Sequence, residues 1–393
     1  MNLKSILAAL LTVSAVSCTE KAPAEVKVGA ECVDTYVPML KDKKIALFSN
    51  HTGIVSDGRH TLDLLTENGL NVVKIFSPEH GFRGTADAGE VVSSSVDEET
   101  GITIVSLYGS HFDYADSLNF ADVDAIITDI QDVGLRYYTY YVTMTKLMES
   151  AARFDKEFYV FDRPNPNGMY VDGPILDMQY RSGVGRLPIP TVHGLTLGEL
   201  AIMENEEGWL DDSLKVKSLN VIKCENYDHQ TRYELPVAPS PNLKTMHSVY
   251  LYPSICYFEA TPVSLGRGTE SPFEMYGHPE YNDTTCFSFT PESVPGAKNP
   301  PQLGNKCYGK DLRGIDDEEI IAKGVDLTYF IDAYQHVENH EKFFYNSFER
   351  LMGRGDIRGM IESGMTAEQI KATWAQDVED FKVLRRKYLL YAE

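Results

Sequence analysis

The chain has 393 residues, of which 43% are hydrophobic and 11% aromatic, so it can bury the core of one large or two medium-sized globular domains. Its 36 lysines and arginines stand against 58 aspartates and glutamates, which gives a formal net charge of −22. Such an acidic surface repels nucleic-acid phosphates and anionic lipid headgroups, so we do not expect this protein to bind nucleic acid.

The N-terminus has the parts of a bacterial export signal. Lys4 supplies a positive charge, the apolar stretch 6–16 is too short to span a bilayer, and the small residues "AVS" precede Cys18. We therefore expect residues 1–17 to be a lipoprotein signal peptide and Cys18 to carry the lipid, with ordinary secretion as the alternative. The predicted location is the cell envelope, as a periplasmic or outer-membrane lipoprotein held by its lipid alone. Residues 18–31, which are polar and rich in Ala and Pro, are expected to form a tether.

A regular alternation of strands and helices follows. Short apolar runs typical of buried parallel strands occupy residues 43–50, 71–78, 102–109, 123–130 and 157–164. Helix-like segments lie between them, at 59–69 and 141–154. This alternation predicts an α/β fold for residues 32–214, a Rossmann-like domain built on an open, mostly parallel sheet.

Ligands of such sheets bind beyond the carboxyl ends of the strands, so the polar residues at these ends are candidates for a site. They are Ser49, Asn50, His51, Pro78, Glu79, His80, Tyr108, Asp129, Gln131, Asp132, Asp162, Arg163 and Asn165. Each residue alone could simply cap a strand or turn the chain. Five strand ends together favour a shared rim that binds a ligand.

The segment at 78–84, "PEHGFRG", has the strongest catalytic character. Its glycines permit tight turns, and a carboxyl group beside Phe76 and Phe82 could have its pKa raised by desolvation, as a general acid at neutral pH requires. Glu79 is therefore the candidate acid. The alternative is a structural salt bridge between Glu79 and Arg83.

A second candidate segment, at 128–141, reads "TDIQDVGLRYYTYY". Aromatic rings beside carboxylates suit a sugar, whose C–H faces stack on the rings while its hydroxyls bind acids and amides. The alternative is that Tyr137, Tyr138, Tyr140 and Tyr141 only fill the start of an amphipathic helix.

Thr196 and Glu199 have the T-x-x-E spacing of a capping box before an apolar run, so we expect Glu199 to be structural. His193 precedes this capping box and has no capping role of its own, so it is a candidate to line a ligand site.

From about residue 215 the pattern changes. A strand-like stretch at 214–227 and a Pro-rich irregular stretch at 238–254 are followed by helical patterns at 326–352 and 366–391. Residues 215–393 are therefore predicted to form a smaller α+β domain. Because ligands often bind between domains, its segment 256–274 is a candidate for the opposite wall of a cleft. The polar residues and ring of that segment are Tyr257, Glu259, Arg267, Glu270 and Glu274.

The motifs of several other protein classes are missing from the sequence. "GRGTES" at 266–271 matches only part of a dinucleotide-binding fingerprint and follows no apolar strand, and there is no P-loop and no G-x-S-x-G elbow. The cysteines after Cys18 include no C-x-x-C pair and no histidine at metal-ligand spacing. We expect no organic cofactor and no metal, although one or two disulfides could form.

Eight segments together carry a resemblance to a known family. They read "SNHTG", "SPEHGFRG", "SLYG", "DIQDVGLRYYTY", "DRPNPNG", "PIPTVHGLTLGELA", "PSPN" and "EATPVSLGRGTESPFE". With them the chain resembles the NamZ-type exo-β-N-acetylmuramidases, a glycosidase family of peptidoglycan turnover. The resemblance implies an active site between a Rossmann-like domain and a smaller C-terminal domain. It also implies cofactor-free release of terminal N-acetylmuramic acid from the non-reducing end of peptidoglycan fragments, with Glu79 as the catalytic glutamate.

The sequence thus predicts a glycosidase that acts on peptidoglycan fragments. Glu79 is the expected general acid, and a second catalytic group is sought among Asp129, Asp132, Glu259, Glu270 and the substrate's own acetamido group. His80 and Asn50 would orient hydroxyls or the acetamide, and Arg83, Arg136 or Arg267 would bind the lactyl carboxylate of muramic acid. The predicted catalytic set is Glu79, His80, Asp129 and Asp132. The predicted binding set is Asn50, His51, Arg83, Arg136, Tyr138, Asn165, His193, Glu259, Arg267 and Glu270.

Two other functions fit the same sequence. A non-catalytic glycan- or muropeptide-binding lipoprotein of the envelope would keep the tyrosines and arginines but would tolerate the loss of Glu79. A different hydrolase of the same polymer, such as an amidase, is the third candidate.

Overall fold

The computed structural model describes residues 24–78, 81–82, 95–107 and 112–393. Its first unit is built on a seven-stranded sheet in the order β3-β4-β2-β1-β5-β6-β7. All neighbouring strands of this sheet are parallel except the short β3, which pairs antiparallel with β4. The strands are β1 (Lys44–Ser49), β2 (Asn71–Ser77), β3 (Ser95–Val96), β4 (Thr103–Ser106), β5 (Ala125–Asp129), β6 (Glu157–Phe161) and β7 (Leu219–Ile222). The five strands predicted from apolar runs are all present, and the α/β fold class is confirmed.

Helices cover both faces of this sheet, because its strands alternate apolar side chains between two cores. On β1, Ala46 and Phe48 join one buried cluster, while Ile45 and Leu47 join the other. The first cluster packs under α3 (Tyr140–Arg153) and α4 (Leu197–Glu206), and the second under α1 (Val33–Leu40) and α2 (Thr61–Glu67). Burial on both faces explains why these strands read as continuous apolar runs.

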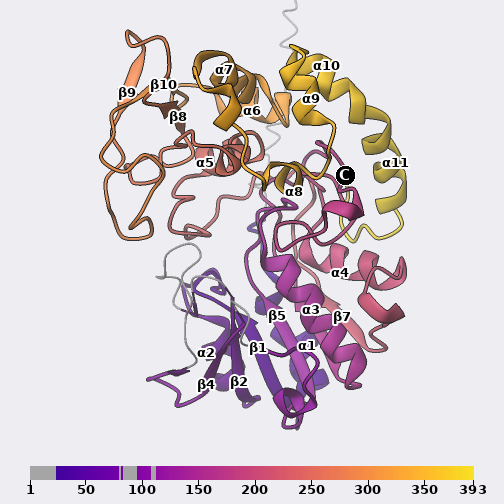
Figure 1. Ribbon diagram of the computed structural model, residues 1–393. Helices are drawn as coiled ribbons and strands as arrows, with labels where there is room; N and C mark the ends of the chain where they lie inside the picture. Colours follow the sequence, from indigo (N-terminus) through magenta and orange to yellow (C-terminus); the bar gives the residue numbers. More distant parts are fainter. Residues whose placement is uncertain (1–23, 79–80, 83–94, 108–111) are drawn as a thin grey trace, which may run out of the picture.

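The second unit, coloured from salmon-red through orange to yellow in Figure 1, combines a small antiparallel sheet with short helices. The sheet has the order β8-β10-β9, with β8 (Met275–His278), β9 (Phe287–Phe289) and β10 (Cys307–Asp311). Its α-helices are α5 (Met246–Ile255), α6 (Asp317–Lys323), α7 (Thr328–His336), α8 (Phe348–Met352), α9 (Ile357–Glu362), α10 (Ala367–Lys371) and α11 (Ala375–Arg385).

Short 3-10 helices occur in both units, at Gly29–Glu31, Ser117–Phe120, Met178–Tyr180, Asp211–Ser213, Cys256–Ala260, His340–Lys342 and Ala372–Trp374.

The helical pattern predicted at 326–352 is broken in the structure. Helix α7 ends at His336, because Val337 is extended and forms a bridge with Tyr281, while the backbone N–H of Asn282 donates to the carbonyl of His336 at 2.9 Å. Only a short 3-10 helix at His340–Lys342 lies between α7 and α8, the next α-helix. Cross-chain pairing therefore overrides the local helical pattern at this point.

Two predicted domain limits need correction. Strand β7 lies after residue 214, where the first domain was expected to end, yet it pairs with β6 and completes the first sheet. The predicted tether 18–31 is also too long, since Lys27 bridges to Glu225 and Val28 and Ala30 are buried. Residues 27–31 therefore belong to the folded body.

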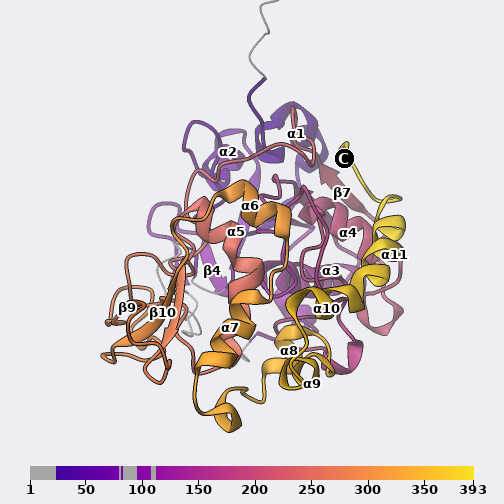
Figure 2. The ribbon, with the colours of Figure 1, turned by 90° about the horizontal axis from the view of Figure 1, so that it is seen from above.

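The two units share one continuous core. A single cluster of buried apolar side chains includes Phe48 of the sheet, Tyr141 of α3, Leu251 of α5 and Phe330 of α7. Figures 1 and 2 both show α11, the last helix, next to α4 of the first unit. The second unit therefore packs directly against the first and shares its core.

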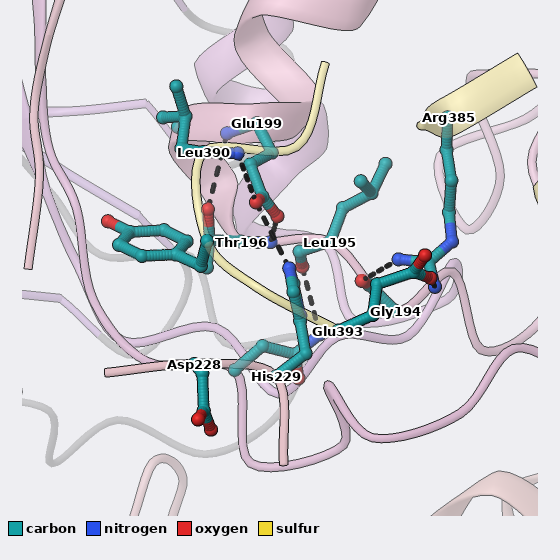
Figure 3. Close-up of polar contacts among 12 residues, drawn as sticks. Gly194, Leu195, Thr196, Glu199, Asp228, His229, Arg385, Leu390 and Glu393 are labelled. Carbon is teal, nitrogen blue, oxygen red and sulfur yellow. Dashed lines mark hydrogen bonds and ion pairs between the residues drawn. The ribbon is translucent and has the colours of Figure 1, made fainter. Parts of the chain in front are cut away.

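The C-terminal tail also returns to the first unit (Figure 3). The backbone N–H of Leu390 donates to Glu199 at 2.8 Å, and Arg385 donates to the carbonyl of Gly194 at 2.7 Å and to Glu393 at 2.6 Å. Tyr391 donates its hydroxyl hydrogen to Asp162 at 2.7 Å. The end of the chain is therefore tied to the carboxyl side of the first sheet.

None of the cysteines at the described positions forms a disulfide. They are Cys32, Cys224, Cys256, Cys286 and Cys307, all of them free thiols. The disulfides that the sequence allowed are therefore not formed among these five. Across the residues that the structure describes, no helix combines the length and the apolarity needed to cross a membrane.

Candidate active site

The carboxyl edge of the sheet contains a reversal of strand order. Strand β1 lies between β2 and β5, so the chain leaves β1 and β5 in opposite directions and opens a crevice at their ends. Ser49 and Asp129 are in register there, and Ser77 and Ser106 are in register at the ends of β2 and β4. The predicted strand ends therefore do converge on one rim.

A cavity of about 390 Å³ adjoins this rim, between residues of the two units. From the first unit its walls include Leu107, Tyr114, Tyr137, Tyr138, Thr139, Tyr140, Val142, Thr143 and Lys146. From the second unit they include Asn242, Tyr252, Glu259, Arg267 and Phe273. Its size lies at the lower end of ordinary ligand pockets, and its mixture of rings and polar groups suits a compact polar ligand such as a sugar.

The predicted tyrosine cluster both lines this cavity and joins the two units. The Tyr137 hydroxyl donates to the carbonyls of Tyr252 and Pro253, at 3.0 and 2.8 Å, and the Tyr138 hydroxyl donates to the carbonyl of Pro239 at 2.8 Å. Burial raises the pKa of Tyr137 and of Tyr138 well above the usual value, so both remain protonated donors. Tyr141 points elsewhere, since it is fully buried and accepts from the backbone of Arg186. The ligand-binding and structural interpretations of this segment are therefore compatible.

Asn50 and His51 support the rim rather than line the cavity. The Asn50 side chain accepts from the backbone and hydroxyl of Thr52 and donates to the Tyr140 hydroxyl at 2.9 Å. His51 contacts the carbonyl of Ala238 through Nε2 at 2.9 Å, across the two units. Asn50 thus holds a cavity tyrosine in place.

Asp129 forms a buried ion pair. Its two carboxylate oxygens accept from Nε and Nη2 of Arg163 at 2.6 and 3.0 Å, and the two side chains are 0% and 3% exposed. Arg163 also donates to the carbonyl of Ile54 at 2.9 Å. A carboxylate held on both oxygens is suited to organising the loops after β1 and β6.

Asp132 is buried beside a void of about 10 Å³ that Arg163 and Asn165 also line. Burial raises the pKa of Asp132 to about 7, and the backbone N–H of Gly134, which donates to Oδ1 at 2.7 Å, opposes that rise. Asp132 is not among the residues that line the cavity.

Asn165, His193 and Glu199 are held in structural contacts. Asn165 donates to the carbonyl of Leu195 at 2.8 Å, and the imidazole Nδ1 of His193 accepts from the backbone of Leu195 at 3.2 Å. Burial lowers the pKa of His193 to about 3, so the ring is neutral. The predicted capping box of Thr196 and Glu199 is confirmed, and Figure 3 shows that Glu199 also binds His229 and Leu390.

The two described arginines of the predicted binding set differ in their surroundings. Arg136 is fully buried and donates from Nη2 to the carbonyls of Leu351 and Met352, at 3.3 and 2.9 Å, at the C-terminal end of α8. Arg267 lines the cavity, where it pairs with Glu259 and lies over the Phe273 ring at 5.1 Å. Of these two arginines, only Arg267 reaches the cavity.

Two further candidates from the second unit, Glu270 and Glu274, are placed away from the cavity. Glu270 is exposed and does not line the cavity, and the buried Glu274 accepts from the Thr245 hydroxyl. Glu79, His80, Arg83, Tyr108 and Cys18 lie outside the described residues. Within the described ranges, no group of three or more His, Cys, Asp or Glu side chains is arranged to hold a metal ion.

The cavity residues that sequence reasoning missed include Tyr114, Asn242 and Lys146. A signal for Lys146 was present, because Thr139, Val142, Thr143 and Lys146 recur at helical spacing and share one face of α3. Tyr114 and Asn242 lie in irregular chain, where no periodicity indicates which way a side chain points.

Comparison with known proteins finds relatives that match nearly the whole chain. A Bacillus subtilis (strain 168) protein named peptidoglycan beta-N-acetylmuramidase NamZ is 37% identical over 376 residues, covering 91% of this chain and 90% of its own. A crystal structure of a DUF1343 family protein from Bacteroides fragilis has a TM-score of 0.87 and 54% identity, covering 94% of this chain and 100% of its own. A second from that organism has a TM-score of 0.76 and 29% identity, covering 93% and 99%.

The family comparison covers both units of the structure. Residues 45–247 match the family described as exo-beta-N-acetylmuramidase NamZ, N-terminal, and residues 250–391 match its C-terminal counterpart. The N-terminal match includes β7, in agreement with the sheet pairing. Matches to both halves, together with the high coverage of a 37% identical relative, show that this chain belongs to the NamZ exo-β-N-acetylmuramidase family.

Proposed function

We propose that this chain is an exo-acting glycosidase that releases terminal N-acetylmuramic acid from the non-reducing end of peptidoglycan fragments. The observation that carries this proposal is a tyrosine-lined cavity of about 390 Å³ at the carboxyl edge of the sheet, in a chain that belongs to the NamZ family. Tyrosine rings offer flat faces to a sugar, and the adjacent polar groups can bind its hydroxyls.

Glu79 is the proposed general acid. It follows Ser77, the last residue of β2, by two positions, and the Ser77 carbonyl accepts at 2.9 Å from the backbone of Leu107, which lines the cavity. A carboxylic acid there would protonate the glycosidic oxygen as the bond to the leaving saccharide breaks. His80 is proposed to orient the substrate beside it.

Two groups are candidates for the second catalytic role. Glu259 is the one described carboxylate of the predicted set that lines the cavity, where it pairs with Arg267. The other candidate is the acetamido oxygen of the substrate itself, which would attack the anomeric carbon in place of a protein carboxylate. Asp129 is proposed to be structural, because Arg163 engages both of its oxygens.

A direct assay tests the proposed activity. The soluble protein, produced without residues 1–18, would be incubated with a chromogenic β-glycoside of N-acetylmuramic acid and with its N-acetylglucosamine counterpart. We expect release of the chromophore from the first glycoside and much slower release from the second. Binding of N-acetylmuramic acid without turnover of either glycoside would favour a binding lipoprotein, and release of peptide from muropeptides would favour an amidase.

The lipid anchor is a separate proposal. Lys4, the short apolar stretch 6–16 and the small residues before Cys18 support an acylated cysteine as the first residue of the mature protein. We expect the native protein to partition into the detergent phase of a Triton X-114 extraction, and Cys18→Ala to appear in the aqueous phase or to remain unprocessed. Mass spectrometry that finds an unmodified mature chain starting at another residue would refute the anchor.

A further inference from the structure

Among the described residues that line the cavity, Lys146 is the one cationic side chain that no described acid neutralises. The described walls of the cavity include two cationic residues, Lys146 and Arg267. Arg267 is already paired with Glu259, to which it donates from Nε at 3.2 Å and from Nη2 at 2.5 Å. Across the residues that the structure describes, the Lys146 ammonium forms no ion pair, and its near neighbour is the Tyr114 ring, 5.3 Å from Nζ to the centroid.

The surroundings of Lys146 leave its charge poorly compensated. Burial lowers the pKa of Lys146, the positive charge of Arg186 lowers it further, and Glu149 is the group that opposes them. The carboxylate of Glu149 is itself occupied, because Arg186 donates to its two oxygens at 2.6 and 2.8 Å. A half-buried ammonium in this position gains from an anionic ligand, since the attraction between two charges strengthens as water is excluded.

Helix geometry directs Lys146 into the cavity. Thr139, Val142 and Thr143 precede it by seven, four and three positions and line the same cavity, so Lys146 lies at the end of a continuous ligand-facing stripe on α3. Tyr138 and Tyr140 line the cavity at the beginning of this helix. A sugar ring placed against the tyrosines would have its substituents within the space that Lys146 borders.

We infer that Lys146 binds a carboxylate of the substrate and is the specificity-determining residue for an acidic sugar in this cavity. This inference rests on the proposed function and puts Lys146 in place of the two described arginines of the predicted set, because Arg136 binds carbonyls at the C-terminal end of α8 and Arg267 pairs with Glu259. The carboxylate has two possible sources. One is the lactyl ether of the terminal muramic acid, and the other is an acidic residue of a peptide stem, whose attachment converts the lactyl carboxylate into an amide.

The test compares four chromogenic glycosides that differ in charge. They are N-acetylmuramic acid, its methyl ester, a peptidyl form whose stem carries a carboxylate, and the same peptidyl form with that carboxylate amidated. Each would be assayed with the wild-type protein, Lys146→Met, Lys146→Arg and the control Lys41→Met. Lys41 is exposed at the end of α1 and does not line the cavity, so its substitution removes the same charge elsewhere.

If the lactyl carboxylate is the ligand, the wild-type protein should prefer the free acid to its methyl ester by at least about tenfold in kcat/KM, as a charge-assisted contact would give. Lys146→Met should bring that ratio close to one, mainly through a higher KM for the free acid, while the rate on the ester is retained. Lys146→Arg should keep most of the preference, and Lys41→Met should keep all of it. If the stem is the source, the same pattern should appear only between the two peptidyl substrates.

Two outcomes would overturn the inference. One is a Lys146→Met protein that keeps the wild-type ratio for both substrate pairs, and the other is a wild-type protein that shows no preference in either pair. If the wild-type protein turns over none of the glycosides, the proposed function fails instead. Calorimetric binding of N-acetylmuramic acid and of N-acetylglucosamine to wild type and Lys146→Met then tests the carboxylate contact independently, and equal affinities throughout would refute it.

Discussion

Replacing Glu79 by glutamine is expected to lower kcat on a muramic acid glycoside with a poor leaving group by roughly a hundredfold or more, the usual loss when a general acid is removed. Glutamine has nearly the same shape but cannot protonate the glycosidic oxygen. The loss should be much smaller on a nitrophenyl glycoside, because nitrophenolate leaves without needing a proton. The comparison of the two leaving groups, measured under saturating substrate, therefore reports on proton donation rather than on binding.

A matched variant separates this effect from a general change in the protein. Glu98 is exposed, and Glu98→Gln makes the same chemical change in the same region of the sequence. We expect Glu98→Gln to have wild-type rates on both substrates and Glu79→Gln to have wild-type unfolding behaviour. Near-normal turnover of the poor leaving group by Glu79→Gln would refute the assignment of Glu79 as the acid.

Replacing Asp129 by asparagine is expected to lower the free energy of unfolding by about 3–5 kcal/mol, the cost of removing one partner from a buried ion pair. Asp129 and Arg163 are almost wholly inaccessible to solvent, so the remaining guanidinium would keep its charge without a carboxylate. The change would be measured from urea unfolding followed by fluorescence and circular dichroism. As a control, Asp57→Asn removes an exposed carboxylate that pairs with Arg59 and should change the free energy of unfolding far less than Asp129→Asn, because solvent screens this pair.

A double variant distinguishes a structural from a catalytic Asp129. Asp129→Leu combined with Arg163→Met removes both charges, and buried ion pairs replaced by apolar side chains of similar size often keep their stability. We expect this double variant to recover most of the loss and to retain turnover. A stable but inactive double variant would instead show that Asp129 takes part in the reaction, contrary to the role proposed from its contact with Arg163.

Local patterns in the sequence were sufficient for the elements whose determinants are neighbours along the chain. The runs that became β1, β5 and β6 are mostly apolar because these parallel strands are buried on both faces, and similar runs marked β2 and β4. The capping box of Thr196 and Glu199 depends on two residues three positions apart, so the sequence alone also predicts it. The convergence of strand ends on one rim follows from the parallel arrangement itself.

Only the tertiary structure decided the contacts between distant parts of the chain. Arg136 was expected to bind a ligand, but its partners at the end of α8 are 215 and 216 residues away, and nothing near Arg136 in the sequence indicates them. Strand β7 belongs to the first sheet because it pairs with β6. Helix α7 ends at His336 because Val337 pairs with Tyr281. The helical stripe that ends at Lys146 is visible in the sequence, but packing alone determined that it faces a cavity and that no described acid neutralises its ammonium.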